Sequence, residues 1–472
     1  MDSIIACTSL LAAVLLLLWV KKLFRPKLPL PPGPRGYPII GNMLDVPSVM
    51  PWKTFRKWSK IYGDVIFLDL PGHPTVVLGS PQAAFDLLEK RSDIYSSRPT
   101  SILHEMMSWD WNMGFMPYSQ LWRDHRRVFH QFFNSREVSK YQPIQVRECR
   151  AFLQRILILS SPSEDLGQDI RQIFTAIILK IMYDMDISNL HDECVLLAQE
   201  AVDGLSRTSI PGVHWVEHFA PLRYIPSWVP GTSSRKMTEY YKPIVVTMRD
   251  KPFDEVKRDM VNRNVSPSVA SAMIERLYQN AGEDLSLVDD TLARNVAAVA
   301  YSAAADTTTS AAQSCLVAMS LYPEVQRKAQ EELDRVVGPR RLPEFDDYDD
   351  LVYVRAIMLE AMRWVVVTPL SLPHQVIRDD KYKGYSIPKG TIIRVNVWLV
   401  LLYHISESLS MQKSIGLCCT TRRFTQNPKY LNRNDSSKTV NSTLLYVILL
   451  HWRLVLDDAY APDDTSVMGR YL

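Results

Sequence analysis

An acidic residue and a hydroxyl residue follow three alanines in the middle of a long apolar segment. Ala303, Ala304 and Ala305 are followed by Asp306 and Thr307. Aspartate and threonine compete for backbone hydrogen bonds inside a helix, so their presence there calls for a reason. We expect both side chains to be buried, and a buried carboxyl group beside a buried hydroxyl group, next to a gap left by small side chains, is suited to delivering protons. A tightly packed helix with a hydrogen-bonded aspartate is the alternative, and this stretch alone favours neither.

The element that must position these side chains is a helix predicted over residues 289–321. Asp289 and Asp290 lie where negative charge favours the start of a helix, and Pro323 lies just past its end. About 33 residues at ~1.5 Å each make a rod of about 50 Å, long enough to cross a whole domain. Because the segment has few charges, we expect most of its faces to be buried.

A second group of polar residues lies on another predicted helix. Trp122 and Arg126 are four residues apart and therefore share a face. Their indole and guanidinium N–H groups could both donate to carboxylates. Arg123, His125 and Arg127 make the same helix basic, so a solvated basic helix is the alternative.

Glu360 and Arg363 form a third pair, on a helix predicted over residues 351–364. Residues three apart share a helix face, and the neighbours of this pair are apolar, so we expect it to be buried. A buried ion pair persists only when further hydrogen bonds satisfy it, which indicates a structural role. A surface ion pair of small effect is the alternative.

Taken in order, these groups resemble the motifs of the cytochromes P-450, the haem-thiolate monooxygenases. Residues 303–308 resemble the oxygen-activation motif, with Ala304 where a glycine is usual. The pair at 122 and 126 resembles the WxxxR motif, and the pair at 360 and 363 resembles the ExxR motif. The resemblance extends across residues 1–398 and favours the membrane-anchored fungal type.

The resemblance implies a fold that is mainly α with a small β portion, and a haem cofactor. It implies that Asp306 and Thr307 relay protons and that Trp122, Arg126 and His374 contact the haem propionates. Gln375 stands where many relatives have arginine, which weakens the expectation for His374. The Glu–Arg pair would support the core with a third partner farther along the chain.

The resemblance also implies the partners of the reaction. Electrons would come from NADPH through a reductase, and the basic helix around Arg126 would suit an acidic reductase surface. The substrate would be an apolar small molecule, hydroxylated or epoxidised. The methionines and aromatics of residues 106–116 would cap its pocket, with ordinary core filling as the alternative.

After Trp398 the resemblance ends. The family continues with a glycine-rich loop that gives a cysteine thiolate to iron, because glycines permit the tight turn that directs N–H groups to the sulfur. Here Cys418 and Cys419 stand in GLCCTTRRFTQNP with no glycine after them, and they are poor candidates for the ligand. The metal ligand therefore stays unknown, and the P-450 fold is expected to be incomplete at its C-terminus.

Two main interpretations of the tail remain open. The chain is either a monooxygenase or an inactive, membrane-anchored remnant whose end was replaced by a frameshift or a retained intron. A haem-free helical binding protein is a third and weaker interpretation.

The N-terminus predicts a membrane anchor. Residues 4–20 are almost purely apolar and reach about 26 Å as a helix, just enough to span a bilayer. Lys21, Lys22, Arg25 and Lys27 follow and favour the cytosolic side. We expect a single-pass protein of the endoplasmic reticulum with a cytosolic catalytic domain; a cleaved signal peptide is the alternative. In the cytosol the glycosylation sequons at Asn264, Asn434 and Asn441 would stay unmodified.

The 472 residues divide by composition into four parts. These are an anchor (1–27), a proline-rich hinge (28–42), a catalytic domain (43–398) and a divergent tail (399–472). A net charge of +3 does not suggest nucleic acid as a partner. Six cysteines without a CxxC motif fit a reduced, intracellular body. Local patterns further predict a hairpin over residues 65–78, a helix over 81–90 and strands within 374–398.

Overall fold

A computed structural model describes residues 28–401, except 135, 159–165, 188–191, 210–211, 263–265 and 282–288. The predicted anchor, Cys418, Cys419 and the sequons at Asn434 and Asn441 lie outside the described residues, as does Asn264. Within the described part of the chain, no helix has both the length and the apolar character needed to cross a bilayer.

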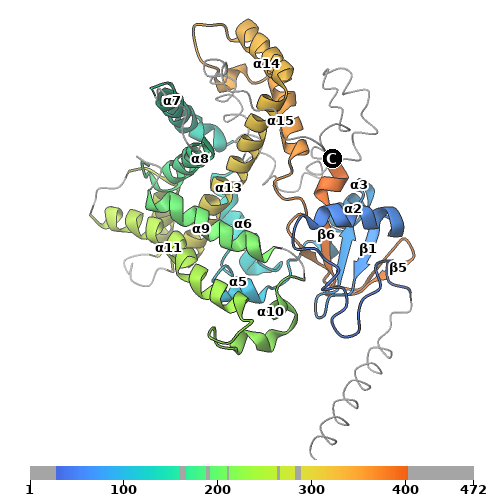
Figure 1. Ribbon diagram of the computed structural model, residues 1–472. Coiled ribbons are helices and arrows are strands. Elements are labelled where there is room, and N and C mark those ends of the chain that lie inside the picture. The colour runs from blue at the N-terminus through green and yellow to red at the C-terminus, as the bar shows by residue number, and fades with distance from the viewer. Residues whose placement is uncertain are drawn as a thin grey trace, which may run out of the picture.

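One long helix organises the molecule. Helix α13 (Thr291–Leu321) runs through its middle, with the other helices mostly on one side and a small sheet on the other (Figure 1). It begins two residues later than predicted, and the Asp289 carboxylate accepts a hydrogen bond from the Thr291 N–H at 2.9 Å. The prediction of a mainly α fold with a small β portion is confirmed.

In the described part of the chain, seven helices make the main contacts with α13, because its many alanines allow close approach. They are α6 (Gln120–Phe132), α8 (Leu166–Tyr183), α9 (Glu193–Thr208), α11 (Ser233–Val261), α12 (Val269–Ala281), α14 (Pro323–Val336) and α15 (Val352–Trp364). Shorter or peripheral elements are α2 (Pro51–Tyr62), α3 (Pro81–Ala84), η1 (Phe85–Glu89), α4 (Ser92–Tyr95), α5 (Ile102–Met106), η2 (Val138–Tyr141), α7 (Gln142–Ile158), α10 (Trp215–His218), η3 (Ala220–Tyr224) and η5 (Phe345–Asp347).

The main sheet has four strands in the order β1-β2-β6-β3. Strands β1 (Val65–Leu68) and β2 (Thr75–Leu78) form the predicted antiparallel hairpin. Strand β6 (Ile392–Val395) pairs in parallel with β2, and β3 (His374–Gln375) pairs antiparallel with β6. A separate two-stranded ribbon is formed by β4 (Asp380–Tyr382) and β5 (Tyr385–Ile387).

The two faces of the main sheet have different surroundings, because side chains alternate along a strand. Val76, Leu78, Ile393 and Val395 are buried in a core with the helical segment of residues 81–95. The alternate residues of the paired strands β2 and β6 therefore lie on the opposite face, with Arg394 beside Val77 in the register.

The proline-rich segment lies along this sheet. The Pro32 carbonyl accepts the Phe67 N–H at 2.9 Å, and the Pro29 carbonyl accepts the Ser386 N–H at 2.8 Å. Its turn requires glycine at position 41, where φ is +55° and a Cβ atom would lie 1.7 Å from the Asp69 carbonyl oxygen. The segment is thus joined to both β1 and β5 by backbone hydrogen bonds.

The methionine- and tryptophan-rich stretch lies mainly in the core. Five of its residues are buried in the largest hydrophobic cluster, namely Met107, Trp109, Trp111, Met113 and Met116. This agrees with the core-filling interpretation. Phe115 alone of this stretch lines the cavity described below.

Candidate functional site

The burial of the continuous helix α13 is interrupted in its middle, and we call this interruption the break. Residues 295–302 are all buried, whereas Ala303 is exposed and Ala304, Asp306 and Thr307 are partly exposed. Small side chains there leave the backbone within reach of a flat group. The break is the feature of the structure that best fits a large planar cofactor.

The structure places Asp306 and Thr307 differently from the buried pair that we expected. The Asp306 side chain is 31% exposed and forms an ion pair with Arg171 of α8 at 2.8 Å. Thr307 is also only partly buried, and its hydroxyl donates to the Ala303 carbonyl at 2.9 Å. The expectation of burial was wrong because the centre of the helix opens at this point.

Trp122 and Arg126 share a face of α6, as their spacing predicts. The Arg126 guanidinium lies 5.5 Å from the centre of the Trp122 ring, in cation–π geometry. The Ser119 hydroxyl caps the helix by accepting the Trp122 N–H at 3.2 Å. The cap and the ring contact together fix where these two side chains lie.

His125 corrects the prediction of a basic helix face. It is only 1% exposed, and burial lowers its pKa, so it adds no charge at neutral pH. Its Nδ1–H donates to the Leu121 carbonyl at 2.8 Å, and its Nε2 accepts from the Asn295 amide at 3.3 Å. His125 therefore connects α6 to α13 and holds Trp122 and Arg126 near the long helix.

The segment around Ser97 connects α6 to β3. The Ser97 hydroxyl accepts the Tyr118 N–H at 3.3 Å, and the Ser97 carbonyl accepts the Gln375 N–H at 2.7 Å. The predicted carboxylate-binding residues on α6 and β3 are thus joined through one short piece of chain, although they are far apart in the sequence.

His374 is neutral in this arrangement. Burial, with the nearby positive charge of Arg98, lowers its pKa to about 3. Its Nδ1–H donates to the Tyr95 carbonyl at 2.8 Å, which leaves Nε2 as an acceptor. A neutral imidazole with its one N–H already used cannot donate to a carboxylate. The expected contact of His374 with a propionate would therefore require its protonation.

Arg98 is a cationic residue that the sequence reasoning missed. Its guanidinium donates to the Leu372 carbonyl at 3.1 Å and to the Pro373 carbonyl at 2.9 Å, next to His374. Burial lowers its pKa to about 10, so it stays charged at neutral pH. No periodic pattern marks this residue, since its position depends on a contact with a segment 274 residues away in the sequence.

Glu360 and Arg363 are bonded to each other on α15. The Arg363 Nε–H donates to the Glu360 carboxylate at 2.6 Å, and a second bond joins the Nη2 group to the other carboxylate oxygen. The side chains are 26% and 19% exposed, so the pair is only partly buried. Between residues 28 and 401, as far as the structure describes them, no third partner binds either side chain.

The three described cysteines do not fit the role of a thiolate ligand. Burial raises the pKa of Cys194 and of Cys315 to about 12, and it raises the pKa of Cys149 as well. A metal ligand needs the ionised thiol, whereas these thiols stay protonated at neutral pH. The described residues thus fit one flat face and the carboxylate edge of a haem, and they supply no axial cysteine.

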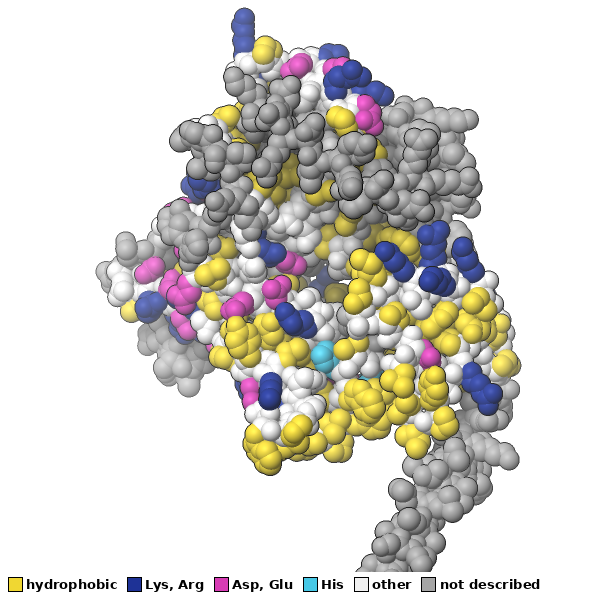
Figure 2. Space-filling model, viewed as in Figure 1, with side chains coloured by type: hydrophobic (Ala, Val, Ile, Leu, Met, Phe, Trp, Pro, Cys, Tyr) yellow, Lys and Arg dark blue, Asp and Glu magenta, His cyan; other side chains and the backbone are white. Residues whose placement is uncertain are grey.

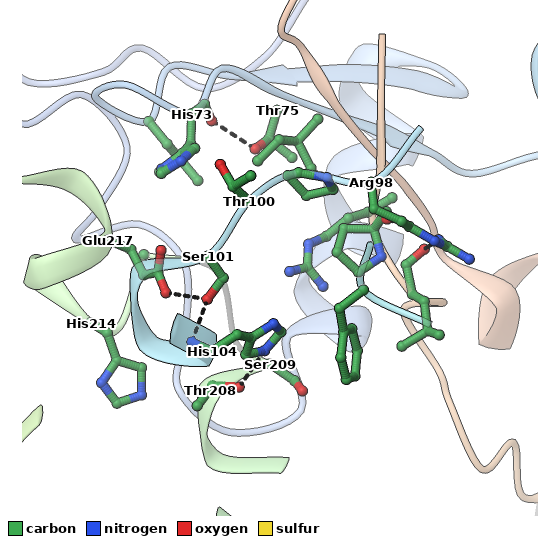
Figure 3. A pocket seen from close by; sticks show the side chains of 18 of the residues that line it. His73, Thr75, Arg98, Thr100, Ser101, His104, Thr208, Ser209, His214 and Glu217 are labelled. Carbon is green, nitrogen blue, oxygen red and sulfur yellow. Dashed lines mark hydrogen bonds between the residues drawn. The ribbon is translucent and has the colours of Figure 1, made fainter. Parts of the chain in front are cut away.

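A cavity of about 120 Å³ lies between the sheet, α5 and the segment leading into α10. Its wall includes His73, His104 and Glu217, which no sequence pattern singles out (Figure 3). The Glu217 carboxylate accepts the Ser101 hydroxyl at 2.6 Å and the N–H groups of residues 102 and 103 at 3.0 and 2.9 Å. The His104 Nε2–H donates to the Thr208 hydroxyl at 3.2 Å.

Comparison with known proteins gives a consistent result. The cytochrome P-450 family model matches residues 31–403. Cytochrome P-450 monooxygenase COX1 of Coprinopsis cinerea is 40% identical over 79% of this chain and 72% of its own length. A cytochrome P-450 monooxygenase of Armillaria gallica is 36% identical over 90% of this chain and 82% of its own. Tryptamine 4-monooxygenase of Psilocybe cyanescens is 35% identical over 79% and 73%, respectively.

Two partly buried histidines predict a loss of stability in acid. The pKa of His374 is lowered to about 3 and that of His104 to about 4, mainly by burial. Below about pH 6.5 the unfolded chain gains protons that the folded protein excludes, so each residue lowers the free energy of unfolding by up to ~1.4 kcal/mol per pH unit. This contribution is fully present above that pH and is lost as the pH falls toward the folded values.

Urea unfolding at a series of pH values measures this effect. His374→Asn keeps a donor for the Tyr95 carbonyl and His104→Gln keeps one for Thr208. The double variant is expected to lose less stability than the wild type between neutral pH and about pH 5. If the free energy of unfolding falls with decreasing pH equally in the two proteins, neither histidine is held neutral.

Proposed function

The chain belongs to the cytochrome P-450 family, and we propose that it acts as a haem-dependent monooxygenase on an apolar organic molecule. The observation that carries this proposal is the break in the burial of α13 at residues 303–307. An acid and an alcohol lie there beside two small alanines, where the centre of the helix is open to a ligand. Relatives from several fungi that are named monooxygenases support the same function.

Bound haem would supply the activation of oxygen and its transfer to the substrate. Ala303 and Ala304 leave room for a flat ring against the backbone of α13. Trp122, Arg126 and the missed residue Arg98 would hold the carboxylate edge of the ring through N–H donors. His374 would add a donor only when a neighbouring negative charge keeps it protonated.

Asp306 and Thr307 would manage the protons. The Thr307 hydroxyl donates to the Ala303 carbonyl and keeps its oxygen free to accept from water or a bound molecule. The Asp306 carboxylate can bind and release a proton, and Arg171 holds it against α8 while it is ionised. Proton transfer between bulk water and the site would pass between these two side chains.

The family implies a reductase as redox partner and a small molecule as substrate. We propose NADPH as the source of electrons. The cavity lining supports an apolar substrate, because Leu70, Phe115, Leu372 and Ile392 all contribute to it. Arg127, which is exposed and paired with Asp124, is a candidate contact for an acidic reductase surface.

Membrane attachment is part of the proposal. Hydrophobic side chains gather along the lower edge of the face shown in Figure 2, which is the edge where α10 lies in Figure 1. Exposed large hydrophobic residues occur around α10 and η3 and in the segment before α2, and include Ile39, Leu44, Val49, Trp215, Tyr224 and Trp228. Such a patch suits contact with a bilayer surface. Together with the apolar run of residues 4–20, it supports an anchored protein of the endoplasmic reticulum.

The division into anchor (1–27), hinge (28–42), catalytic domain (43–398) and tail (399–472) is retained as a proposal. An inactive remnant is the second candidate. It is favoured by one observation, namely that all three described cysteines are buried, protonated thiols. If the chain is instead an active monooxygenase, its thiolate ligand would have to come from Cys418 or Cys419, which lie outside the described residues.

A reduced carbon-monoxide difference spectrum of the full chain in membranes tests the proposed function directly. A monooxygenase is expected to show the red-shifted Soret band of thiolate-bound haem, and replacement of the ligating cysteine by serine abolishes that band. Cys418→Ser and Cys419→Ser would identify the ligand, with Cys315→Ser as the matched control. Absence of the band in protein shown to be present would support the remnant.

Thr307→Ala tests the proton relay. Removing the hydroxyl is expected to lower product formation on the order of 100-fold while oxygen consumption continues, because positioned proton transfer contributes about that much. The measurement is the ratio of product formed to oxygen consumed. Thr309→Ala is the matched control, since the Thr309 hydroxyl makes the same kind of bond to the Ala305 carbonyl but is fully buried. An unchanged ratio for Thr307→Ala would exclude the relay.

Alkaline carbonate extraction tests the anchor. The full chain is expected to stay in the membrane pellet, because residues 4–20 can span the apolar layer. Leu11→Arg combined with Leu15→Arg is expected to release it, since each central arginine costs roughly 3 kcal/mol of insertion. Leu11→Ala with Leu15→Ala is the control. Release of the unmodified chain would contradict the anchor.

A further inference from the structure

Arg394 is a cationic residue in a sheet whose strands consist mainly of apolar residues. The four strands read VIFL, TVVL, HQ and IIRV, so it is their one lysine or arginine. Its neighbours Ile393 and Val395 are buried in the core on one face of the sheet. The Arg394 side chain lines the cavity on the other face, together with Thr75 and Ile392.

The Arg394 guanidinium has no partner within the described part of the chain. It makes no hydrogen bond, ion pair or ring contact there. Burial lowers its pKa to about 10, so it is still a cation at neutral pH. Arg394 is only partly exposed, and a cation that is withdrawn from water is normally paired, because leaving it without a counter-charge is costly. Arg98, in the wall of the same cavity, follows this rule by donating to two carbonyl groups.

No other group in the cavity compensates for this charge. Glu217 is the one carboxylate among the lining residues, and it is already bound by Ser101 and by two backbone N–H groups. Burial, with the charge of Arg394, lowers the pKa of His104 to about 4 against the opposing effect of Glu217. Burial also lowers the pKa values of His73 and His218. His73, His104 and His218 are therefore neutral at pH 7, and the charge of Arg394 is not paired by the groups that line the cavity.

We propose that Arg394 is a specificity-determining residue that binds a carboxylate group of the substrate. A guanidinium offers two parallel N–H groups that match the two oxygens of a carboxylate, and such charged bidentate pairs are strong. A carboxylic acid with an apolar remainder suits this cavity. Its carboxylate would supply the counter-charge for Arg394, and its hydrocarbon part would contact the apolar side chains of the wall.

The size of the cavity limits which part of the substrate it can hold. Its volume is about 120 Å³, somewhat less than the ~150 Å³ of a cavity that accommodates benzene. It can thus hold a carboxyl group and the first few carbons, with Leu70, Phe115 and Leu372 around them. The rest of the molecule would extend out of the cavity. That the bound acid is a substrate rests on the proposed monooxygenase function; the anion site itself does not.

Equilibrium dialysis of the full chain in membranes tests the site without requiring turnover. The probes are decanoate and phenylacetate, each compared with its uncharged methyl ester. The wild type is expected to bind at least one acid about tenfold or more tightly than its ester. Arg394→Met is expected to weaken that acid roughly 10- to 100-fold and to change ester binding by less than about twofold. Arg394→Lys is expected to give an intermediate loss, since it keeps the charge but not the fork.

Arg378→Met is the matched control, because Arg378 lies close by in the chain but is exposed and paired with Asp93. It should leave both probes unaffected. The proposal is overturned if the wild type prefers no acid to its ester, or if Arg394→Met weakens acid and ester equally. It is also overturned if Arg394→Met lowers the haem content and not acid binding, because the arginine would then hold a haem carboxylate.

The outcome is separable from that of the proposed function. Arg394-dependent binding of acids by a protein that lacks the thiolate-type Soret band would preserve the anion site and refute the monooxygenase. The band without any preference for acids would refute the anion site alone.

Discussion

The burial of α13 is the constraint on which the rest of the structure depends. A helix of 31 residues with few charges must be covered on most faces, and seven other helices among the described residues provide most of that cover. In the middle of the helix the cover is incomplete: Ala303 is exposed, and Asp306 and Thr307 are half-buried. Polar groups in the centre of a core helix are costly only when they are buried without partners, and here they lie where the cover is incomplete. The break in packing and the candidate site are therefore one feature.

Much of this could be predicted because the relevant signals are local. The long helix, the 65–78 hairpin and the pairing of Trp122 with Arg126 each depend on residues within a few positions of one another. The Ser80 hydroxyl, for example, accepts the Ala83 N–H at 3.2 Å and caps the helix that was expected after it. Periodicity and capping act over one or two turns, and they are therefore visible in the sequence.

The errors and omissions share one cause, which is contact with distant chain. Asp306 was expected to be buried, but it pairs with Arg171, which is 135 residues away. His125 was assigned to a basic surface, but Asn295 holds it in the core. The importance of Arg98 depends on the carbonyl groups of residues 372 and 373. None of these partners can be deduced from spacing, because the fold alone brings them together.

Arg98 and Arg394 are both cations that are partly withdrawn from water, but only Arg98 is satisfied by hydrogen bonds within the protein. Both are buried enough for their pKa values to fall to about 10, and both line one cavity. Arg98 donates to main-chain carbonyls, so its charge is satisfied within the protein and fixes the segment before His374. Arg394 is held in the middle strands of a sheet whose backbone groups are used by the ladder, so carbonyls cannot satisfy it in the same way. A cation that the scaffold positions rigidly but leaves unpaired is prepared to bind a ligand, whereas a satisfied one contributes to the scaffold itself.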